Sequence, residues 1–359
     1  MTRRMSFMAW QGIEGHERIT AAFVASEACG HLAGSYLFIG PPGVGKASFA
    51  RTLAKSLTCL AASPGLVACG RCASCAQADA GSHPDIDIVS KPEDRATIPL
   101  ELFIGDAAHR MREGLCWRLL LKPAISGRKV AIICDADHLS EESANCLLKT
   151  LEEPPSNAVI ILVGTALERQ LPTIRSRCQV IRFGPLATDV VERLLTAELC
   201  RSGDETEPTA IAAAATNSGG SLDRARLLLD AEVGAFRSRL LELLCHRPLR
   251  GVALARETNE VVEAAGKEAP PRRARLAVVL GAAVDFFRQA LRHAATRELP
   301  ADPALAAAVS SWPGTADEAA KALEFTLDAL DAIEMNAHLP TLVDAWTALL
   351  EAPRLAQVS

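Results

Sequence analysis

The sequence has only one tyrosine in 359 residues, and aromatic side chains make up 4% of it. Alanine is abundant instead, which favours a largely helical chain. Apolar runs are short, since none approaches the roughly 20 residues that a membrane-spanning helix needs. Residues 1–10 also lack the apolar core of a signal peptide. We therefore expect a cytoplasmic protein with no membrane partner.

Positive charge is not in excess either. The formal net charge is −5, which disfavours a free-standing nucleic-acid-binding protein but leaves room for a local basic surface or a DNA site shared within an assembly.

The 359 residues allow two or three domains. The 11 cysteines are an odd number without an export signal, and four of them cluster. Reduced thiols and one metal site are therefore expected rather than disulfides.

Short apolar runs alternate with helical patterns from about residue 10 to 185, which is the rhythm of a parallel α/β sheet. Gly184 and Pro185 end this region, and the remainder reads as helical. Within that remainder, the proline-containing stretches 266–273 and 298–317 are expected to be connecting loops. The predicted strands are 36–39, 86–89, 130–134, 159–163 and 180–183.

Residues 40–47 read Gly-Pro-Pro-Gly-Val-Gly-Lys-Ala and meet the phosphate-loop (P-loop) pattern G-x-x-x-x-G-K at Gly40, Gly45 and Lys46. Backbone N–H groups of such a loop surround phosphates, and the lysine reaches the terminal ones. A strand-like run precedes the loop and an amphipathic helical pattern follows it, which argues against a chance glycine-rich turn. The expected ATP- or ADP-binding residues are Gly40, Gly43, Gly45, Lys46 and Ala47.

The metal-binding end of this nucleotide site is altered. The residue after the lysine normally places a hydroxyl on Mg²⁺, whereas Ala47 has no side-chain oxygen. Residues 130–137 have the form of the strand that normally ends in Asp-Glu, and here Cys134 takes the Asp position and Asp135 the Glu position. If the register shifts by one, Asp135 becomes the metal ligand and Ala136 replaces the glutamate. In either register we expect a nucleotide-binding fold that does not hydrolyse its own nucleotide, and the sequence leaves open whether nucleotide still binds.

Four cysteines lie close together with the spacing C-x9-C-x2-C-x2-C, namely Cys59, Cys69, Cys72 and Cys75. Two overlapping C-x2-C steps bring thiolates together on tight turns, and four thiolates suit tetrahedral Zn²⁺. Free thiols or an iron–sulfur cluster are the alternatives, although no Cys-Pro pair follows the run. We expect one structural zinc in a small insertion at about residues 59–75, with His83 as a turn residue rather than a ligand.

Two further segments carry a family resemblance. Residues 140–155, Ser-Glu-Glu-Ser-Ala-Asn-Cys-Leu-Leu-Lys-Thr-Leu-Glu-Glu-Pro-Pro, resemble the signature helix of bacterial clamp-loader subunits, with Ser140 as its N-cap and prolines at its end. Residues 171–178, Leu-Pro-Thr-Ile-Arg-Ser-Arg-Cys, resemble the Ser-Arg-Cys segment of the same family. With the cysteine insertion, they make the chain similar to the delta-prime subunits of the bacterial DNA polymerase III clamp loader. The resemblance covers residues 10–230 well and the C-terminal part loosely.

This resemblance implies an AAA+ protein of three domains. They are a P-loop domain with a parallel sheet and the zinc-binding insertion at residues 1–185, a helical lid at 186–238, and an all-α collar for oligomerisation at 239–359. The resemblance also implies that Arg177 is an arginine finger that points into the ATP of a neighbouring subunit. The alternative for this side chain is an ordinary surface ion pair. Thr165 lies near the family's first sensor position, whereas Asp223 stands where active subunits carry the second-sensor arginine.

The implied partners are the tau/gamma and delta subunits of the clamp loader and, through the complex, the sliding clamp and primer–template DNA. The implied function is to load the clamp with ATP that partner subunits hydrolyse, within a DNA-directed DNA polymerase (nucleotidyltransferase) holoenzyme. One alternative is a tau/gamma motor subunit, which needs the loop hydroxyl, the Asp-Glu pair and the sensor arginine. Another is a stand-alone P-loop regulator or kinase, in which residues 149–155 and 176–178 have no role. A zinc-dependent nucleic-acid-binding module fits the acidic balance poorly.

Overall fold

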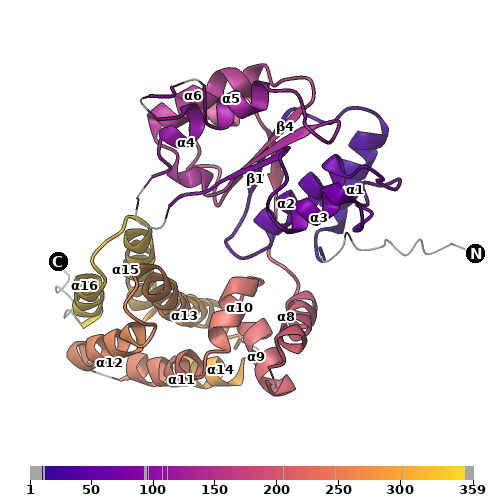
Figure 1. Cartoon of the computed structure of the whole chain (residues 1–359). Coiled ribbons are helices and arrows are strands. Elements are labelled where there is room, and N and C mark those ends of the chain that lie inside the picture. The colour runs from indigo at the N-terminus through magenta and orange to yellow at the C-terminus, as the bar shows by residue number, and fades with distance from the viewer. Residues whose placement is uncertain are drawn as a thin grey trace, which may run out of the picture. The chain divides into compact units, whose positions relative to one another are not determined.

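The structure is a computed structural model that describes residue 10 and the ranges 13–92, 97–106, 108–110, 112–204, 206–246, 248–300 and 302–351, together with residue 95. Residues 1–9, which entered the expectation that no signal peptide is present, lie outside the described residues. The chain forms two compact units (Figure 1). The first comprises Met1–Arg193 with Gly220–Leu222, and the second comprises Leu194–Gly219 with Asp223–Ser359.

The first unit is built on a parallel sheet with the strand order β2-β3-β4-β1-β5. The strands are β1 (Ser35–Ile39), β2 (Ile86–Val89), β3 (Lys129–Ile133), β4 (Ala158–Gly164) and β5 (Gln179–Arg182). Each predicted strand is confirmed to within one residue at either end. Strands β1, β3 and β4 are buried along their whole length, which is why they read as unbroken apolar runs.

Helices cover both faces of this sheet (Figure 1). One face packs against α1 (Glu17–Ala28) and α2 (Lys46–Thr58), with α3 (Ala73–Asp79) beside α2. The other face packs against α4 (Glu101–Ile104), α5 (Leu115–Leu120) and α6 (Glu141–Glu152). Alternate side chains of one strand supply the two cores, so Phe38 packs with Phe49 of α2, whereas Leu37 packs with Leu147 of α6. Two short elements complete the unit, the 3₁₀ turn η1 (Ala136–His138) and α7 (Pro172–Arg175).

The second unit is all-helical in the part of the chain that the structure describes. It contains α9 (Pro208–Asn217), α10 (Leu222–Leu228), α11 (Ala231–Cys245), α12 (Gly251–Glu263), α13 (Ala269–Thr296), α14 (Pro303–Ser311), α15 (Ala316–Glu334) and α16 (Leu339–Glu351), and α8 (Thr188–Ser202) leads into it. The Trp346 ring is buried in its core, where Nε1 donates to Thr326 Oγ1 at 3.0 Å. Among the described helices, none combines the length and the apolar content that crossing a bilayer requires.

The prediction that the proline-containing stretches 266–273 and 298–317 are loops is wrong in part. Helix α13 already begins at Ala269, with its paired prolines in the first turn. Helix α14 lies inside the stretch 298–317, and it begins at Pro303 after the N-cap Asp302, whose Oδ1 accepts from Ala304 N–H at 3.0 Å. A proline in the first turn loses no helical hydrogen bond, because the N–H groups there have no partner in the helix. The division of the helical part into a lid at 186–238 and a collar at 239–359 stays a prediction.

Candidate functional site

The P-loop joins β1 to α2, where the sequence placed it. Gly43 and Gly45 have φ angles of 73° and 90°, and Gly45 is the N-cap of α2. Gly40 is required for a different reason, since a Cβ there would lie 2.2 Å from the carbonyl oxygen of Phe183. The glycines therefore let the backbone turn tightly and approach the end of β5.

We expect Gly40→Ala to lower the stability of the chain by about 2 kcal/mol or more, because backbone atoms cannot move away from the new Cβ at small cost. Gly127→Ala is the matched control, since a Cβ at Gly127 meets nothing within 4 Å and its φ lies outside the positive range that disfavours other residues. Thermal unfolding of the two variants measures the difference. Equal midpoints would contradict the close approach to Phe183.

Lys46 is the first residue of α2, and its side chain is directed back over the loop. Its Nζ donates to the carbonyl oxygens of Gly40 and Pro41, both at 2.6 Å, and the residue is 7% exposed. His16 also contacts this loop, since its Nε2 lies 2.7 Å from the carbonyl oxygen of Val44. A carbonyl only accepts, so this nitrogen carries the proton. His16 was not predicted from the sequence, because a lone histidine before a helix carries no pattern.

The part of the site where Mg²⁺ would bind has few side-chain oxygen ligands. Ala47 is the second residue of α2 and Cys134 follows the last residue of β3. Burial raises the pKa of the Cys134 thiol, which keeps it neutral at neutral pH. Asp135 is exposed with a φ of 55°, and its Oδ2 accepts from the N–H of Lys91 at 3.3 Å. Mg²⁺ binds oxygen ligands, so of these three residues only Asp135 could serve it.

Thr165 directly follows β4, and its backbone is tied to the P-loop. Its carbonyl oxygen accepts from Gly40 N–H at 3.1 Å, and its own N–H donates to Asp137 Oδ2 at 2.7 Å. The other oxygen of Asp137 accepts from Gln170 Nε2. Asp137 and Gln170 were also not predicted as site residues. The only sequence signal for this pair is that Asp137 is a carboxylate shortly after the end of the buried strand β3.

The Arg177 segment and the signature helix lie together. Helix α6 begins after Ser140, whose Oγ accepts from Ser143 N–H at 3.1 Å, so the predicted N-cap is confirmed. Glu152, at the end of this helix, accepts from Arg177 Nε at 2.7 Å. The arginine side chain is 28% exposed and the glutamate side chain 49% exposed. Exposed ion pairs are worth about 0–1 kcal/mol, so the guanidinium can leave Glu152 at little cost.

The second-sensor region does not supply a free arginine. Arg224 of α10 donates through Nη2 to Asp285 Oδ2 of α13 at 2.7 Å, within the second unit. Asp223, which stands at the sensor position, is bonded to Arg226 at 2.5 Å. The two neighbouring side chains thus take different partners, as expected for successive residues of a helix.

The four clustered cysteines converge as the spacing predicted. Their sulfur atoms all lie within 4.8 Å of one another, with 3.9 Å between Cys59 and Cys72 and 4.0 Å between Cys69 and Cys75. A tetrahedral zinc with bonds of about 2.3 Å needs sulfurs about 3.8 Å apart, so the donor set fits such an ion. The cluster could therefore bind a metal.

The pKa values of two of these cysteines are shifted in opposite directions. The N–H of Cys75 donates to Cys72 Sγ at 3.4 Å, which lowers the pKa of Cys72 to about 6. Burial raises the pKa of Cys75 to about 12, so this thiol needs a bound cation to ionise at neutral pH. His83 stays outside the cluster, since its Nδ1 accepts from Asp85 N–H at 3.0 Å and its Nε2 lies 2.9 Å from Ser74 Oγ. It is a turn residue, as expected.

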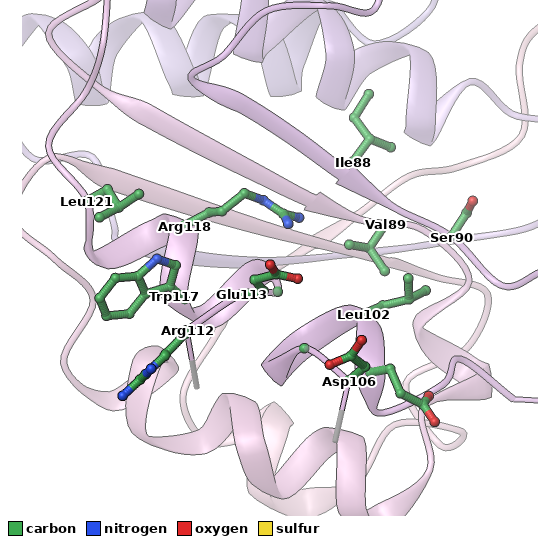
Figure 2. A pocket seen from close by; sticks show the side chains of 13 residues that line it. Ile88, Val89, Ser90, Leu102, Asp106, Arg112, Glu113, Trp117, Arg118 and Leu121 are labelled. Carbon is green, nitrogen blue, oxygen red and sulfur yellow. The ribbon is translucent and has the colours of Figure 1, made fainter. Parts of the chain in front are cut away.

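A separate pocket of about 710 Å³ opens beside the edge strand β2 (Figure 2). Its walls come from β2, α4 and α5, with Trp117 and Leu102 each 38% exposed. Arg118 crosses it and donates through Nε to Asp87 Oδ1 at 2.5 Å. None of the predicted site residues lines this pocket, so it is distinct from the nucleotide site.

Comparison with known proteins gives the family of the sheet-containing part. Residues 15–187 match the family model described as "DNA polymerase III, delta subunit". The chain is 35% identical over 161 residues to the DNA polymerase III subunit delta' of Bacillus subtilis, which covers 45% of each protein. It is 30% identical over 230 residues to subunit delta' of Escherichia coli, which covers 64% of this chain and 63% of that protein. Over its sheet-containing part, the chain is similar to clamp-loader delta-prime subunits.

The chain is also 33% identical over 212 residues to the gamma/tau subunit of Mycobacterium tuberculosis, which covers 59% of the chain and 35% of that relative. The chain thus spans between about a third and two thirds of the length of these relatives. A solved gamma subunit-related protein from Thermotoga maritima aligns with 94% of this chain and 99% of that protein at 18% identity. Its TM-score of 0.41 is too low to support an argument.

Proposed function

We propose that this chain is the delta-prime-type subunit of a DNA polymerase III clamp loader, which supplies Arg177 in trans to ATP bound by a neighbouring motor subunit. The observation that carries the proposal is the contrast between the chain's own nucleotide site and Arg177. The nucleotide site lacks metal ligands at Ala47 and Cys134, whereas Arg177 is retained two residues after the short helix α7. A subunit of this kind contributes to hydrolysis without turning over its own nucleotide.

The physical role of the finger is electrostatic. Charge grows on the oxygens of the transferred phosphoryl group only in the transition state, and a guanidinium aimed at it stabilises that charge. The arginine suits this task because its planar fork makes two parallel hydrogen bonds. Its ion pair with Glu152 would hold it in a defined place until a neighbour binds.

The match to gamma/tau subunits makes a motor subunit the second candidate. A motor subunit needs a loop hydroxyl and an Asp-Glu pair, and this chain has Ala47 with Cys134 and Asp135 at those positions. It also needs the second-sensor arginine, and Arg224 is paired with Asp285. A stand-alone P-loop regulatory NTPase would leave residues 149–155 and 176–178 without a role.

The partners follow from the same proposal. They are the tau/gamma and delta subunits in a hetero-oligomer, with the sliding clamp and primer–template DNA reached through the complex, in the cytoplasm. The four cysteines would hold one structural Zn²⁺, because a closed set of thiolates leaves no position for substrate. ATP or ADP can enter the P-loop, where Gly40, Gly45 and Lys46 would contact the phosphates without completing a metal site.

We expect the isolated chain to show no Mg²⁺-dependent ATP turnover above background. The reason is that Ala47 and Cys134 stand where oxygen ligands of the Mg²⁺ ion are needed. Adding it to the motor subunit should raise the motor's ATPase rate. Steady-state phosphate release from each protein alone and from the mixture measures both effects. A rate of about 1 s⁻¹ or more from the isolated chain, abolished by Lys46→Ala, would make it a motor subunit.

A further inference from the structure

A carboxylate bridge lies at the carboxyl end of the central strands. Asp137 accepts from the backbone N–H of Thr165 with one oxygen, at 2.7 Å, and from Gln170 Nε2 with the other. The amide of Gln170 is enclosed, since the residue is 3% exposed. Gly164 leaves room for the pair, because a Cβ there would lie 2.6 Å from Gln170 Nε2 and 2.9 Å from Asp137 Oδ1. Hydrogen bonds to a charged carboxylate are among the stronger ones, so the bridge fixes the end of β4 against the turn that follows.

This turn leads without interruption to Arg177. Gln170 is two residues before the start of α7, and the N–H of Arg177 donates back to the carbonyl oxygen of Ile174 at 3.1 Å. Ile174 is 1% exposed, so α7 is anchored in the core. At the other end of the bridge, the carbonyl oxygen of Thr165 accepts from Gly40 N–H at 3.1 Å. Hydrogen bonds and the short backbone segment from Gln170 to α7 thus connect the first glycine of the P-loop to the arginine.

We propose that Asp137 and Gln170 are positioning residues, which set the place of Arg177 relative to the sheet and the P-loop and thereby its reach into a neighbouring subunit. This inference rests on the proposed function of Arg177. The physical reason is that a finger acts only when its guanidinium meets the phosphoryl oxygens at hydrogen-bond distance. A displacement of about 1 Å can reduce a rate by 10²-fold, even when the altered residue is remote from the chemistry.

The bridge can be broken and re-formed by exchanging its chemical groups. Gln170→Glu places two carboxylates face to face, and neither can donate. Adding Asp137→Asn restores the pair, because the new amide nitrogen donates to Glu at position 170 while its oxygen still accepts from Thr165 N–H. Gln170→Ala removes the hydrogen-bond donor without placing a second carboxylate beside Asp137. It is the variant to measure if Gln170→Glu fails to fold. Gln289→Glu makes the same substitution on α13 as the matched control.

The measurement is the ATPase kcat of the motor subunit in the reconstituted complex, at concentrations that saturate assembly. We expect Gln170→Glu to lower kcat about tenfold to a hundredfold, Gln170→Ala to lower it less, and the double variant to recover most of the rate. The affinity for the partner subunit should stay within about twofold in each case. In an Arg177→Ala background, Gln170→Glu should have no further effect, since its whole action passes through the arginine.

The positioning role is overturned if Gln170→Glu leaves kcat unchanged while Arg177→Ala lowers it. It is also overturned if the double variant does not recover, or if Gln170→Glu lowers kcat equally with and without Arg177, because a merely structural role would act in both backgrounds. If Arg177→Ala itself has no effect, the proposed function fails, and that outcome is separate.

Discussion

Changing Arg177 to alanine is expected to slow ATP hydrolysis by the neighbouring motor subunit by about 10³-fold or more, and clamp loading onto primed DNA with it. The chain itself should stay folded and able to assemble, because the side chain is partly exposed and its ion pair with Glu152 is worth little to stability. The measurement is the ATPase rate of the reconstituted complex, with assembly followed by size-exclusion chromatography.

Three further variants sharpen this result. Arg177→Lys should recover little, since an ammonium on a flexible stem does not reproduce the planar fork. Arg175→Ala removes an exposed arginine at the end of α7, two residues before Arg177, and is the matched control, expected to leave the rate within about twofold. Lys46→Ala should do far less harm than Arg177→Ala, because this chain's own site is not expected to turn over. The reverse ranking would contradict the delta-prime assignment.

Replacing both Cys72 and Cys75 with serine is expected to remove one bound zinc per chain and to unfold the insertion around residues 59–75. A structural zinc site contributes its binding free energy to folding, about 10 kcal/mol or more in small zinc-dependent domains, so the loss is large locally. The nucleotide site and Arg177 lie on other elements, and we expect the partner ATPase to fall much less than the stability of the insertion.

Elemental analysis of protein made in zinc-containing medium measures the metal, and proteolysis of residues 59–75 measures the local unfolding. Cys29→Ser and Cys200→Ser change two exposed thiols outside the cluster and should retain one equivalent of zinc. Full zinc retention by the double serine variant would show that the metal is bound elsewhere.

The elements of the sheet could be read directly from the sequence. Buried parallel strands need side chains that are apolar on both faces, so β1, β3 and β4 appear as continuous apolar runs whose ends are sharp. The phosphate loop and the cysteine cluster were equally readable, because a fixed spacing along the chain dictates their geometry. Ala47 and Cys134 were visible for the same reason, as the wrong residue types within otherwise intact patterns.

The helical part was read less well where proline was involved. Composition marked the stretches 266–273 and 298–317 as loops, yet each contains the start of a helix. Proline breaks a helix interior but suits a first turn, and composition alone does not distinguish the two positions. The N-cap Asp302, one residue before Pro303, was the local signal that would have identified the start of α14.

The sequence by itself determined the strands and their order along the chain, the P-loop, the altered metal positions at Ala47 and Cys134, and the cysteine site, since each is a local pattern in the sequence. Only the tertiary structure decided how the site is held. Asp137 meets Gln170 across 33 residues, His16 meets Val44 across 28, and Arg177 meets Glu152 across 25. These partners carry no common period or spacing, because parallel strands return distant segments to one edge of the sheet, where unrelated side chains become neighbours.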